Sequence, residues 1–373
     1  MMAAGTAPVR APLRAEPGFL AALEDLLVSR WHQWELPGEP SRPFDFLLLG
    51  HYEPRNKVVL CFPAGATRPA AIAKVARRPG YGASRLRREI NILRDLQRIV
   101  PGTIAAEIPR PLFYGLCWGN VTGITSALSG DVLWDQVGRD FTWGTGGRVR
   151  RVLVRTASGL LPLHQATLRP RTPESLAALA RPVHAARRVH RFSPVAIHLL
   201  DSVVSELAGL NPAELPTVCE HGDFWMGNTL VNGEGFGVID WEDGEIEGIP
   251  FMDLFMLIHT SAVLRRNQER RIPRLLDAYV ESHFEATWVS DVARALLAQY
   301  AASLGLTRDA AHPLFPLLLA RLSTREHDAL GASGTLDRFW RDAIELFAER
   351  RSQFLWLGEI PTARGELDEG ALE

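Results

Sequence analysis

The amino-acid sequence predicts an α+β protein, in which a small antiparallel sheet precedes a larger helical part. Three short apolar runs, at 44–50, 57–62 and 70–77, are separated by turns that contain Pro, Gly and Asn. Runs of this length between such turns are typical of antiparallel strands that follow one another along the chain. From about residue 131 the apolar residues recur at helical spacing, except in one predicted hairpin near 228–240.

The composition is that of a globular protein with enough residues for two hydrophobic cores. The chain has 373 residues, of which 46% are hydrophobic and 23% are charged. The joint between the sheet-rich and the helical part is expected near 125–130, where the composition changes. We expect four regions: a disordered tail at 1–18, a sheet-rich N-terminal part at 19–128, a helical C-terminal part at 129–360 and an acidic tail at 361–373.

Charge and hydropathy argue against several classes of partner. The formal net charge of -2 and the pI near 6.6 argue against nucleic-acid binding, which favours a basic face. No apolar run approaches the roughly 20 residues that a membrane helix needs, and the N-terminus lacks the apolar core of a signal peptide. Cys61, Cys117 and Cys219 lie far apart without CxxC spacing, so we expect a reducing, cytoplasmic location.

The remaining elements of the N-terminal part follow from local patterns. Apolar residues at helical spacing predict a helix over 19–34, before the first strand. A second helix follows the third strand, and we expect Ser84 to cap its N-terminus. Two strand-like segments come next, at 108–119 and 120–130, and complete the predicted sheet.

Lysine is scarce in this sequence, and its scarcity singles out one residue. Lysine and arginine total 41, but the only lysines are Lys57 and Lys74. A lysine is a compact point charge on a flexible stem, whereas arginine is a planar fork, so a lysine kept among so many arginines can be needed as a lysine. Lys57 lies in a polar turn, where chance explains it equally well. Lys74 lies in an apolar run and is the stronger functional candidate.

The segment 218–254 contains the residues from which we infer chemistry. Two apolar runs flank a Gly-Glu-Gly turn, which predicts a hairpin. If the hairpin is symmetric about Glu234, Asn228 lies opposite Asp240, and Asp223 precedes Asn228 by five residues. An amide oxygen and a carboxylate are hard ligands that suit a magnesium ion bound to polyphosphate. Asp223 is then free to accept a proton from an attacking hydroxyl.

The same segment carries a family resemblance. The motif HGD, followed after four residues by Asn228 and later by IDW with Asp240, resembles the catalytic segment of the aminoglycoside phosphotransferase and choline kinase family. The resemblance implies a protein-kinase-like two-lobed fold, with a small antiparallel-sheet N-lobe and a larger helical C-lobe. It also implies that Asp223 is the catalytic base and that Asn228 and Asp240 bind Mg²⁺. By the same resemblance, His221 orients the catalytic loop and Asp253 steadies it.

The N-terminal part contains the residues that this fold needs for ATP. Lys74 lies on the third predicted strand and Glu89 on the helix that follows. The resemblance implies that Lys74 contacts the α- and β-phosphates and that Glu89 fixes it through an ion pair. The run 124–130 would then be the hinge, where the backbone of Ser126 and Leu128 receives adenine.

One segment departs from the family pattern. The loop at 50–57 joins the first two strands and is not rich in glycine, whereas family members usually carry Gly and a Ser-Asn pair there to cover the phosphates. We expect Gly50 and Asn56 to take that role, with Lys57 supplying a charge in place of backbone amides.

These observations predict an ATP- and Mg²⁺-dependent phosphotransferase that moves the γ-phosphate to a hydroxyl of a small molecule. The acceptor class that the family implies is an aminoglycoside, a sugar, an amino alcohol or a related metabolite. Five acids between Asp240 and Glu247 would favour a cationic acceptor if they line its cleft, although a solvated acidic loop explains them equally well.

Two other functions remain open from the sequence. A protein kinase is disfavoured, because only thirteen residues separate Asp240 from Asp253 and leave little room for a peptide platform. A catalytically inactive nucleotide-binding or scaffold protein is the second, and only the unusual loop at 50–57 supports it. The sequence contains no Walker A loop, no HExxH and no G-x-S-x-G motif, which excludes the enzyme classes that those motifs define.

Overall fold

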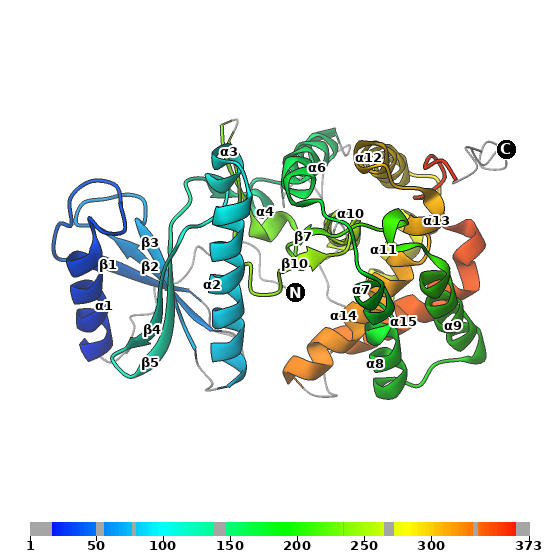
Figure 1. Ribbon diagram of the computed structural model, residues 1–373, viewed down its shortest axis with the longest axis horizontal. Helices are drawn as coiled ribbons and strands as arrows, with labels where there is room; N and C mark the ends of the chain where they lie inside the picture. The colour runs from blue at the N-terminus through cyan, green and yellow to red at the C-terminus, as the bar shows by residue number, and fades with distance from the viewer. Residues whose placement is uncertain are drawn as a thin grey trace. The chain divides into compact units, whose positions relative to one another are not determined.

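The computed structural model describes residues 17–49, 56–76, 80–137, 147–233, 235–264, 272–330 and 335–362 (Figure 1). The chain divides into two compact units. The sheet unit contains the described residues up to Asp131 together with Leu230–Gly244. The helical unit contains Val132–Thr229 and the described residues from Glu245 onward.

The sheet unit is built on five antiparallel strands. Their order is β1-β2-β3-β5-β4, with every neighbouring pair antiparallel, as the apolar runs predict. Because β3 is central, its side chains alternate between two covered faces. Ala73 and its alternate neighbours are fully or almost fully buried on one face, whereas Lys74 points to the other. The strands are β1 (Asp45–Leu49), β2 (Lys57–Phe62), β3 (Ala71–Val75), β4 (Pro111–Cys117) and β5 (Asn120–Ser126).

Helices cover both faces of this sheet (Figure 1). Helix α1 (Pro17–Arg30) packs its apolar side chains, Leu27 among them, into the core cluster that includes Ala73 of β3. Helix α2 (Tyr81–Ile99) packs against β4 and β5 on the other face, and it is followed by the short α3 (Gly102–Ala105). The prediction that Ser84 caps α2 is wrong: the helix begins at Tyr81, and the Ser84 amide donates to the carbonyl of Gly80 inside the first turn.

The predicted hairpin near 228–240 is present as β8 (Thr229–Asn232) and β9 (Gly235–Val238), which are neighbours in a small sheet. The sequence placed this segment in the helical part, but the structure groups Leu230–Gly244 with the sheet unit. The amide of Val238 donates to the carbonyl of Glu107 at 2.9 Å, which ties β9 to the segment after α3. The two-residue strand β6 (Asp131–Val132) lies where the two units meet in sequence.

The helical unit is organised around the apolar helix α10, whose residues from Met252 to Ile258 are all buried. Strands β7 (Val218–Glu220) and β10 (Glu245–Gly248) pair antiparallel. Along the chain, β7 precedes the predicted hairpin and β10 follows it. The helices of the unit are α4 (Leu133–Val137), α6 (Gly147–Thr167), α7 (Pro173–Ala178), α8 (Arg181–Val189), α9 (Pro194–Gly209), α10 (Met252–Leu264), α11 (Ile272–Phe284), α12 (Trp288–Leu304), α13 (Arg308–Ala311), α14 (Leu314–Leu330) and α15 (Thr335–Arg350), with 3₁₀ turns η1 (Pro212–Glu214), η2 (Met226–Asn228) and η3 (Arg351–Gln353).

Within the described ranges, no helix combines the length and the apolar character that crossing a bilayer requires.

The core of the helical unit contains a histidine pair in an aromatic cage. Nδ1 of His259 lies 3.1 Å from Nε2 of His283, and rings of Tyr279, Phe315 and Trp340 surround His259. Nε2 of His259 has no hydrogen-bond partner among the described residues. Burial lowers the pKa of His259 from 6.5 to about 3, because the apolar core disfavours its charged form.

This cage predicts acid sensitivity of the fold. The unfolded chain binds a proton at His259 below pH 6.5, whereas the folded chain does not until about pH 3. The free energy of unfolding should therefore fall as the pH drops from 6.5 toward 3, by about 1.4 kcal/mol per pH unit for this one group. His259→Phe removes the group that takes up this proton on unfolding. The free energy of unfolding of the variant, measured with urea, should therefore decline less steeply with falling pH than that of the wild type. Parallel pH curves for the two proteins would contradict the assignment.

Candidate active site

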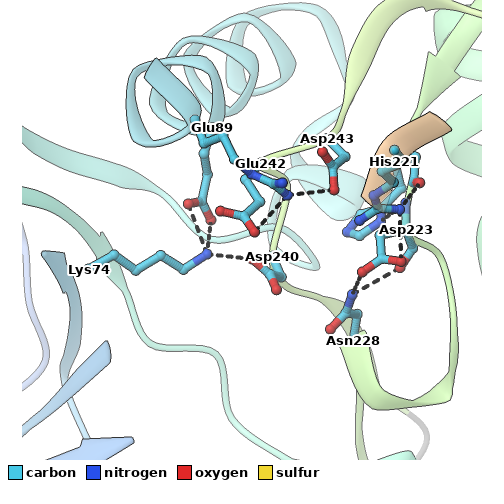
Figure 2. A network of polar contacts seen from close by, with 11 residues as sticks. Lys74, Glu89, His221, Asp223, Asn228, Asp240, Glu242 and Asp243 are labelled. Carbon is cyan, nitrogen blue, oxygen red and sulfur yellow. Dashed lines mark hydrogen bonds and ion pairs between the residues drawn. The ribbon is translucent and has the colours of Figure 1, made fainter. Parts of the chain in front are cut away.

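Lys74 is the centre of a network of ion pairs in the sheet unit (Figure 2). Its Nζ lies 2.7 and 2.9 Å from the two carboxylate oxygens of Glu89 on α2, and 2.6 Å from Oδ1 of Asp240. The side chain of Lys74 is 16% exposed and that of Glu89 only 5%. The structure therefore brings together three of the residues that the sequence singled out, and Asp240 reaches Lys74 across 166 residues of chain.

The charges of this network are unequal. Burial alone lowers the pKa of Lys74, but the carboxylates of Asp240, Glu89 and Glu242 raise it above its usual value. The pKa values of two carboxyl groups also rise, because burial disfavours their charged form and the neighbouring carboxylates repel one another. Burial, and then repulsion by Asp240, raise the pKa of Glu242 to about 7. Burial and Asp240 also raise the pKa of Glu89, although Lys74 opposes the rise.

The loop that follows Asp240 is fixed to α2 by a second basic residue, which the sequence reasoning missed. A terminal nitrogen of Arg85 lies 2.8 Å from Oε1 of Glu242 and 2.7 Å from Oδ2 of Asp243. The indole of Trp241 is fully buried, and its Nε1 donates to the carbonyl of Val238. Asp240 itself has φ +70°, a left-handed conformation that non-glycine residues adopt rarely and that marks a tightly determined turn.

Three of the five acids between Asp240 and Glu247 are held in ion pairs. A cationic acceptor would require acids between Asp240 and Glu247 to line its cleft. Asp240 pairs with Lys74, and the next two acids pair with Arg85. Burial lowers the pKa of the buried Arg171, and the carboxylates of Glu220, Glu247 and Glu245 oppose this fall. The cationic acceptor stays a prediction, which would depend on Glu245 and Glu247.

The helical unit positions the motif HGD through a buried aspartate. Asp253 at the start of α10 accepts hydrogen bonds from the amides of His221 (2.6 Å) and Gly222 (2.9 Å). Gly222 has φ +77°, where a side chain would be strained. Burial raises the pKa of Asp253, but the imidazole of His164, whose Nε2 lies 3.4 Å from Oδ2 of Asp253, and that of His221 outweigh it and hold the pKa below its usual value. A buried, ionised Asp253 therefore fixes the backbone that leads to Asp223.

Asp223 is held from two sides within the helical unit. Nδ2 of Asn228 donates to its backbone oxygen at 2.9 Å and to Oδ2 at 3.2 Å. Arg325 of α14 lies 3.2 Å from Oδ1 of Asp223 and also donates to the carbonyl of Gly222. Asn228 ends the turn η2 and is not on the strand where the sequence placed it. Nothing in the sequence predicted Arg325, because it lies 102 residues from its partner and carries no motif.

A second arginine of α14 pairs with the strand before the motif. Arg321, one helical turn before Arg325, lies 2.6 Å from Oε1 of Glu220 on β7. The other oxygen of Glu220 accepts the amide of Ile249 at 3.1 Å, which links β7 to the chain after β10. Burial raises the pKa of Glu220 to about 7, and Arg321 opposes the rise. These contacts fix the strand that delivers the motif.

The predicted nucleotide-binding residues of the hinge border a cavity in the sheet unit. Ser126 ends β5, and its Oγ accepts the amide of Arg110 at 2.9 Å. Leu128 follows it outside the strand, and its backbone makes no hydrogen bond to another described residue. Both residues line a cavity of about 450 Å³, which lies beside the segment that joins α2 to β4.

Asn56, the remaining predicted residue, lies near the start of α2. Its Oδ1 is buried without a hydrogen-bond partner among the described residues, and a Cβ placed on Gly82 would lie 2.6 Å from that oxygen. The rest of the loop expected to cover the phosphates, Gly50 included, lies outside the described residues. Lys57, at the start of β2, is exposed.

The comparisons with known proteins identify the family. The sequence profile described as the phosphotransferase enzyme family matches residues 62–314, which is more than half of the chain. The protein therefore belongs to the phosphotransferase enzyme family, and the resemblance seen in the catalytic segment is confirmed. A search of curated proteins by sequence gave no match.

Solved structures of three small-molecule kinases are similar to this chain. An aminoglycoside phosphotransferase from Streptomyces rimosus, in complex with ADP and streptomycin, is 16% identical, with a TM-score of 0.43 over 87% of this chain and 98% of that chain. A choline/ethanolamine kinase family protein from Mesorhizobium loti is 15% identical, with a TM-score of 0.45 over 91% and 97%. A choline kinase from Streptococcus pneumoniae is 11% identical, with a TM-score of 0.45 over 88% and 99%. The family match and the observed elements confirm the predicted α+β fold class.

The ion pairs around Lys74 predict a stability effect that is independent of any ligand. Lys74→Met leaves the buried carboxylate of Glu89 without its cation, which typically costs about 3–5 kcal/mol of unfolding free energy. Adding Glu89→Gln removes the unpaired charge, so the double variant should recover part of the loss. Lys57→Met, at the exposed start of β2, should change the unfolding free energy by less than about 0.5 kcal/mol. Chemical denaturation of all four proteins tests this, and equal effects at the two lysines would refute the network.

Proposed function

We propose that this protein transfers the γ-phosphate of ATP to a hydroxyl group of a small molecule, with Mg²⁺ as the metal ion. The observation that supports this most directly is the buried Lys74, bound both to Glu89 of α2 and to Asp240. A lysine fixed by a helix carboxylate beside a metal-binding aspartate is what phosphoryl transfer in kinase-like enzymes needs. Membership of the phosphotransferase enzyme family agrees with this reading.

In this proposal the sheet unit holds the nucleotide. Lys74 donates to the α- and β-phosphates, and Glu89 keeps its ammonium in place. The unpaired backbone of Leu128 and the carbonyl of Ser126 receive the adenine ring. Asn56 supplies an amide near the phosphates, and its unpartnered buried oxygen is consistent with a missing polar ligand.

Mg²⁺ would be held by Asp240 and Asn228, both of which offer oxygen ligands. The charge around Asp240 suits a cation, because two basic side chains pair with four carboxylates and leave a surplus of negative charge. The basic side chains are Lys74 and Arg85, and the carboxylates are those of Glu89, Asp240, Glu242 and Asp243. No group of three or more His, Cys, Asp and Glu ligands occurs within the described ranges, so the phosphates would complete the coordination. The ion would neutralise the charge that develops on the phosphoryl oxygens.

Asp223 would act as the general base in the helical unit. Its carboxylate accepts the proton of the acceptor hydroxyl while the hydroxyl oxygen attacks the γ-phosphorus. A new bond then forms between the acceptor oxygen and phosphorus, the bond from the γ-phosphorus to the bridging oxygen breaks, and ADP leaves. Asn228 and Arg325 support this role because both hold the carboxylate in one orientation.

We place this activity in the cytoplasm. Cys61, Cys117 and Cys219 are all buried free thiols, which suits a compartment that keeps thiols reduced.

Asp223→Asn tests the proposal. The acceptor is first found by screening sugars, amino alcohols and aminoglycosides for acceptor-dependent ADP release. The variant keeps the size of the side chain but cannot take up the proton, so kcat should fall by at least the roughly hundredfold typical of losing a general base. Affinity for a non-hydrolysable ATP analogue, measured by calorimetry, should change less than about twofold, because Asp223 does not bind the nucleotide.

The matched control is Asp291→Asn, an exposed aspartate of α12 whose ion pair among the described residues is to Arg294, and it should leave kcat unchanged. Wild-type turnover in the Asp223 variant would exclude Asp223 as the base. Nucleotide binding by the wild type without turnover of any acceptor would instead favour the scaffold alternative.

A further inference from the structure

Helix α2 holds the loop that begins at Asp240, directly at three consecutive residues and at Asp240 through Lys74 of β3. Glu89 binds Lys74, which in turn binds Asp240, and the Glu89 carboxylate also accepts the backbone amide of Trp241. One turn earlier on the same helix, Arg85 binds the next two residues, Glu242 and Asp243 (Figure 2). The spacing of four residues places Arg85 and Glu89 on one face of α2.

The contacts of Arg85 are shielded enough to affect structure. The side chain of Arg85 is 20% exposed, and those of Glu242 and Asp243 are each 17% exposed. Ion pairs at this depth are screened less by water and salt than surface pairs are, and one guanidinium shared by two carboxylates restrains both. Without Arg85, three carboxylates within four residues of chain would repel one another beside a single ammonium.

The proposed function requires the contact between Asp240 and Lys74 to change when nucleotide and metal bind. In the described state Asp240 binds Lys74. In the proposed function Lys74 turns to the phosphates and Asp240 to the metal, so the direct bond between them is replaced. The bonds of Arg85 to Glu242 and Asp243 involve neither the metal ligand nor the phosphates. They therefore persist through the exchange and keep the loop on α2.

We propose that Arg85 is a positioning residue for the metal site: it fixes the loop of Asp240 to α2 and thereby sets the affinity for Mg²⁺, without touching the nucleotide. This inference rests on the proposed function, because it assigns the metal to Asp240. It goes beyond that function by making α2 an element that controls metal binding. Residues that orient metal ligands from behind typically contribute 10- to 100-fold to metal affinity.

The test is calorimetric titration of a non-hydrolysable ATP analogue, with saturating Mg²⁺ and with EDTA. Arg85→Gln should reduce the magnesium-dependent gain in affinity at least tenfold, while the affinity in EDTA changes less than twofold. Arg85→Lys keeps the charge but not the fork, so it should fall between the wild type and Arg85→Gln. Asp240→Asn, which alters the proposed ligand itself, sets the upper limit of the loss.

The matched control is Arg98→Gln, three turns later on α2, which removes an exposed arginine whose partner Asp95 is also exposed. It should behave as wild type in both titrations. A general loss of stability would lower the affinity for the ATP analogue in EDTA as well as in Mg²⁺. Equal losses of affinity under the two conditions in Arg85→Gln would therefore overturn the inference. An Arg85→Gln protein indistinguishable from wild type would overturn it too.

A double-mutant cycle locates the effect. If Arg85 acts through the loop, Arg85→Gln should have little further effect in a protein that already carries Glu242→Gln and Asp243→Asn. An undiminished effect in that background would show that Arg85 acts elsewhere. If the affinity of the wild type for the ATP analogue does not depend on Mg²⁺, the proposed metal site itself is refuted. If the wild type responds to Mg²⁺ and the Arg85 variants respond equally, only the role of Arg85 is refuted.

Discussion

The buried ammonium of Lys74 is the constraint on which the sheet unit depends. A charge on the central strand of a sheet is tolerated only when it is paired, because its desolvation costs several kcal/mol. Its two partners come from different elements, Glu89 from α2 and Asp240 from the loop after β9. The pair between Lys74 and Asp240 links Leu230–Gly244 to the sheet, although the intervening Val132–Thr229 belongs to the helical unit. Pairing one charge thus assembles the proposed phosphate- and metal-binding groups.

The helical unit uses the same principle with the charges reversed. Its buried anion is Asp253, which is fully buried and binds two successive amides of the HGD motif. Arginines of α14 then pair with Glu220 before the motif and with Asp223 inside it. In each unit, a buried charge and at least one arginine therefore hold the segments that carry the candidate residues. Preorganised groups of this kind avoid reorganisation when charge develops during phosphoryl transfer.

The parts that sequence could predict are those with a local signal. Short apolar runs separated by turn residues predicted the antiparallel sheet. The apolar run at 70–77 predicted that Lys74 lies on the third strand. Arg85 and Arg325 could not be predicted, because their partners lie 157 and 102 residues away and no local pattern distinguishes them from the other arginines of the chain. Ser84 misled because a good capping residue lay inside a helix that begins earlier. The ion pairs of the acidic loop could not be predicted either, because composition gives no information about pairing.

In the proposed function Lys74 binds the phosphates as a compact ammonium, and exchanging it for arginine tests this role. Lys74→Arg keeps the charge that the fold needs, but its wide, rigid fork cannot satisfy Glu89 and the phosphates together. Calorimetric titration with Mg²⁺ and a non-hydrolysable ATP analogue should show at least a tenfold loss of affinity in Lys74→Arg, with the melting temperature of the free protein nearly unchanged. Lys57→Arg, at the exposed lysine, should bind as wild type does. Equal and mild effects at the two positions would contradict this account.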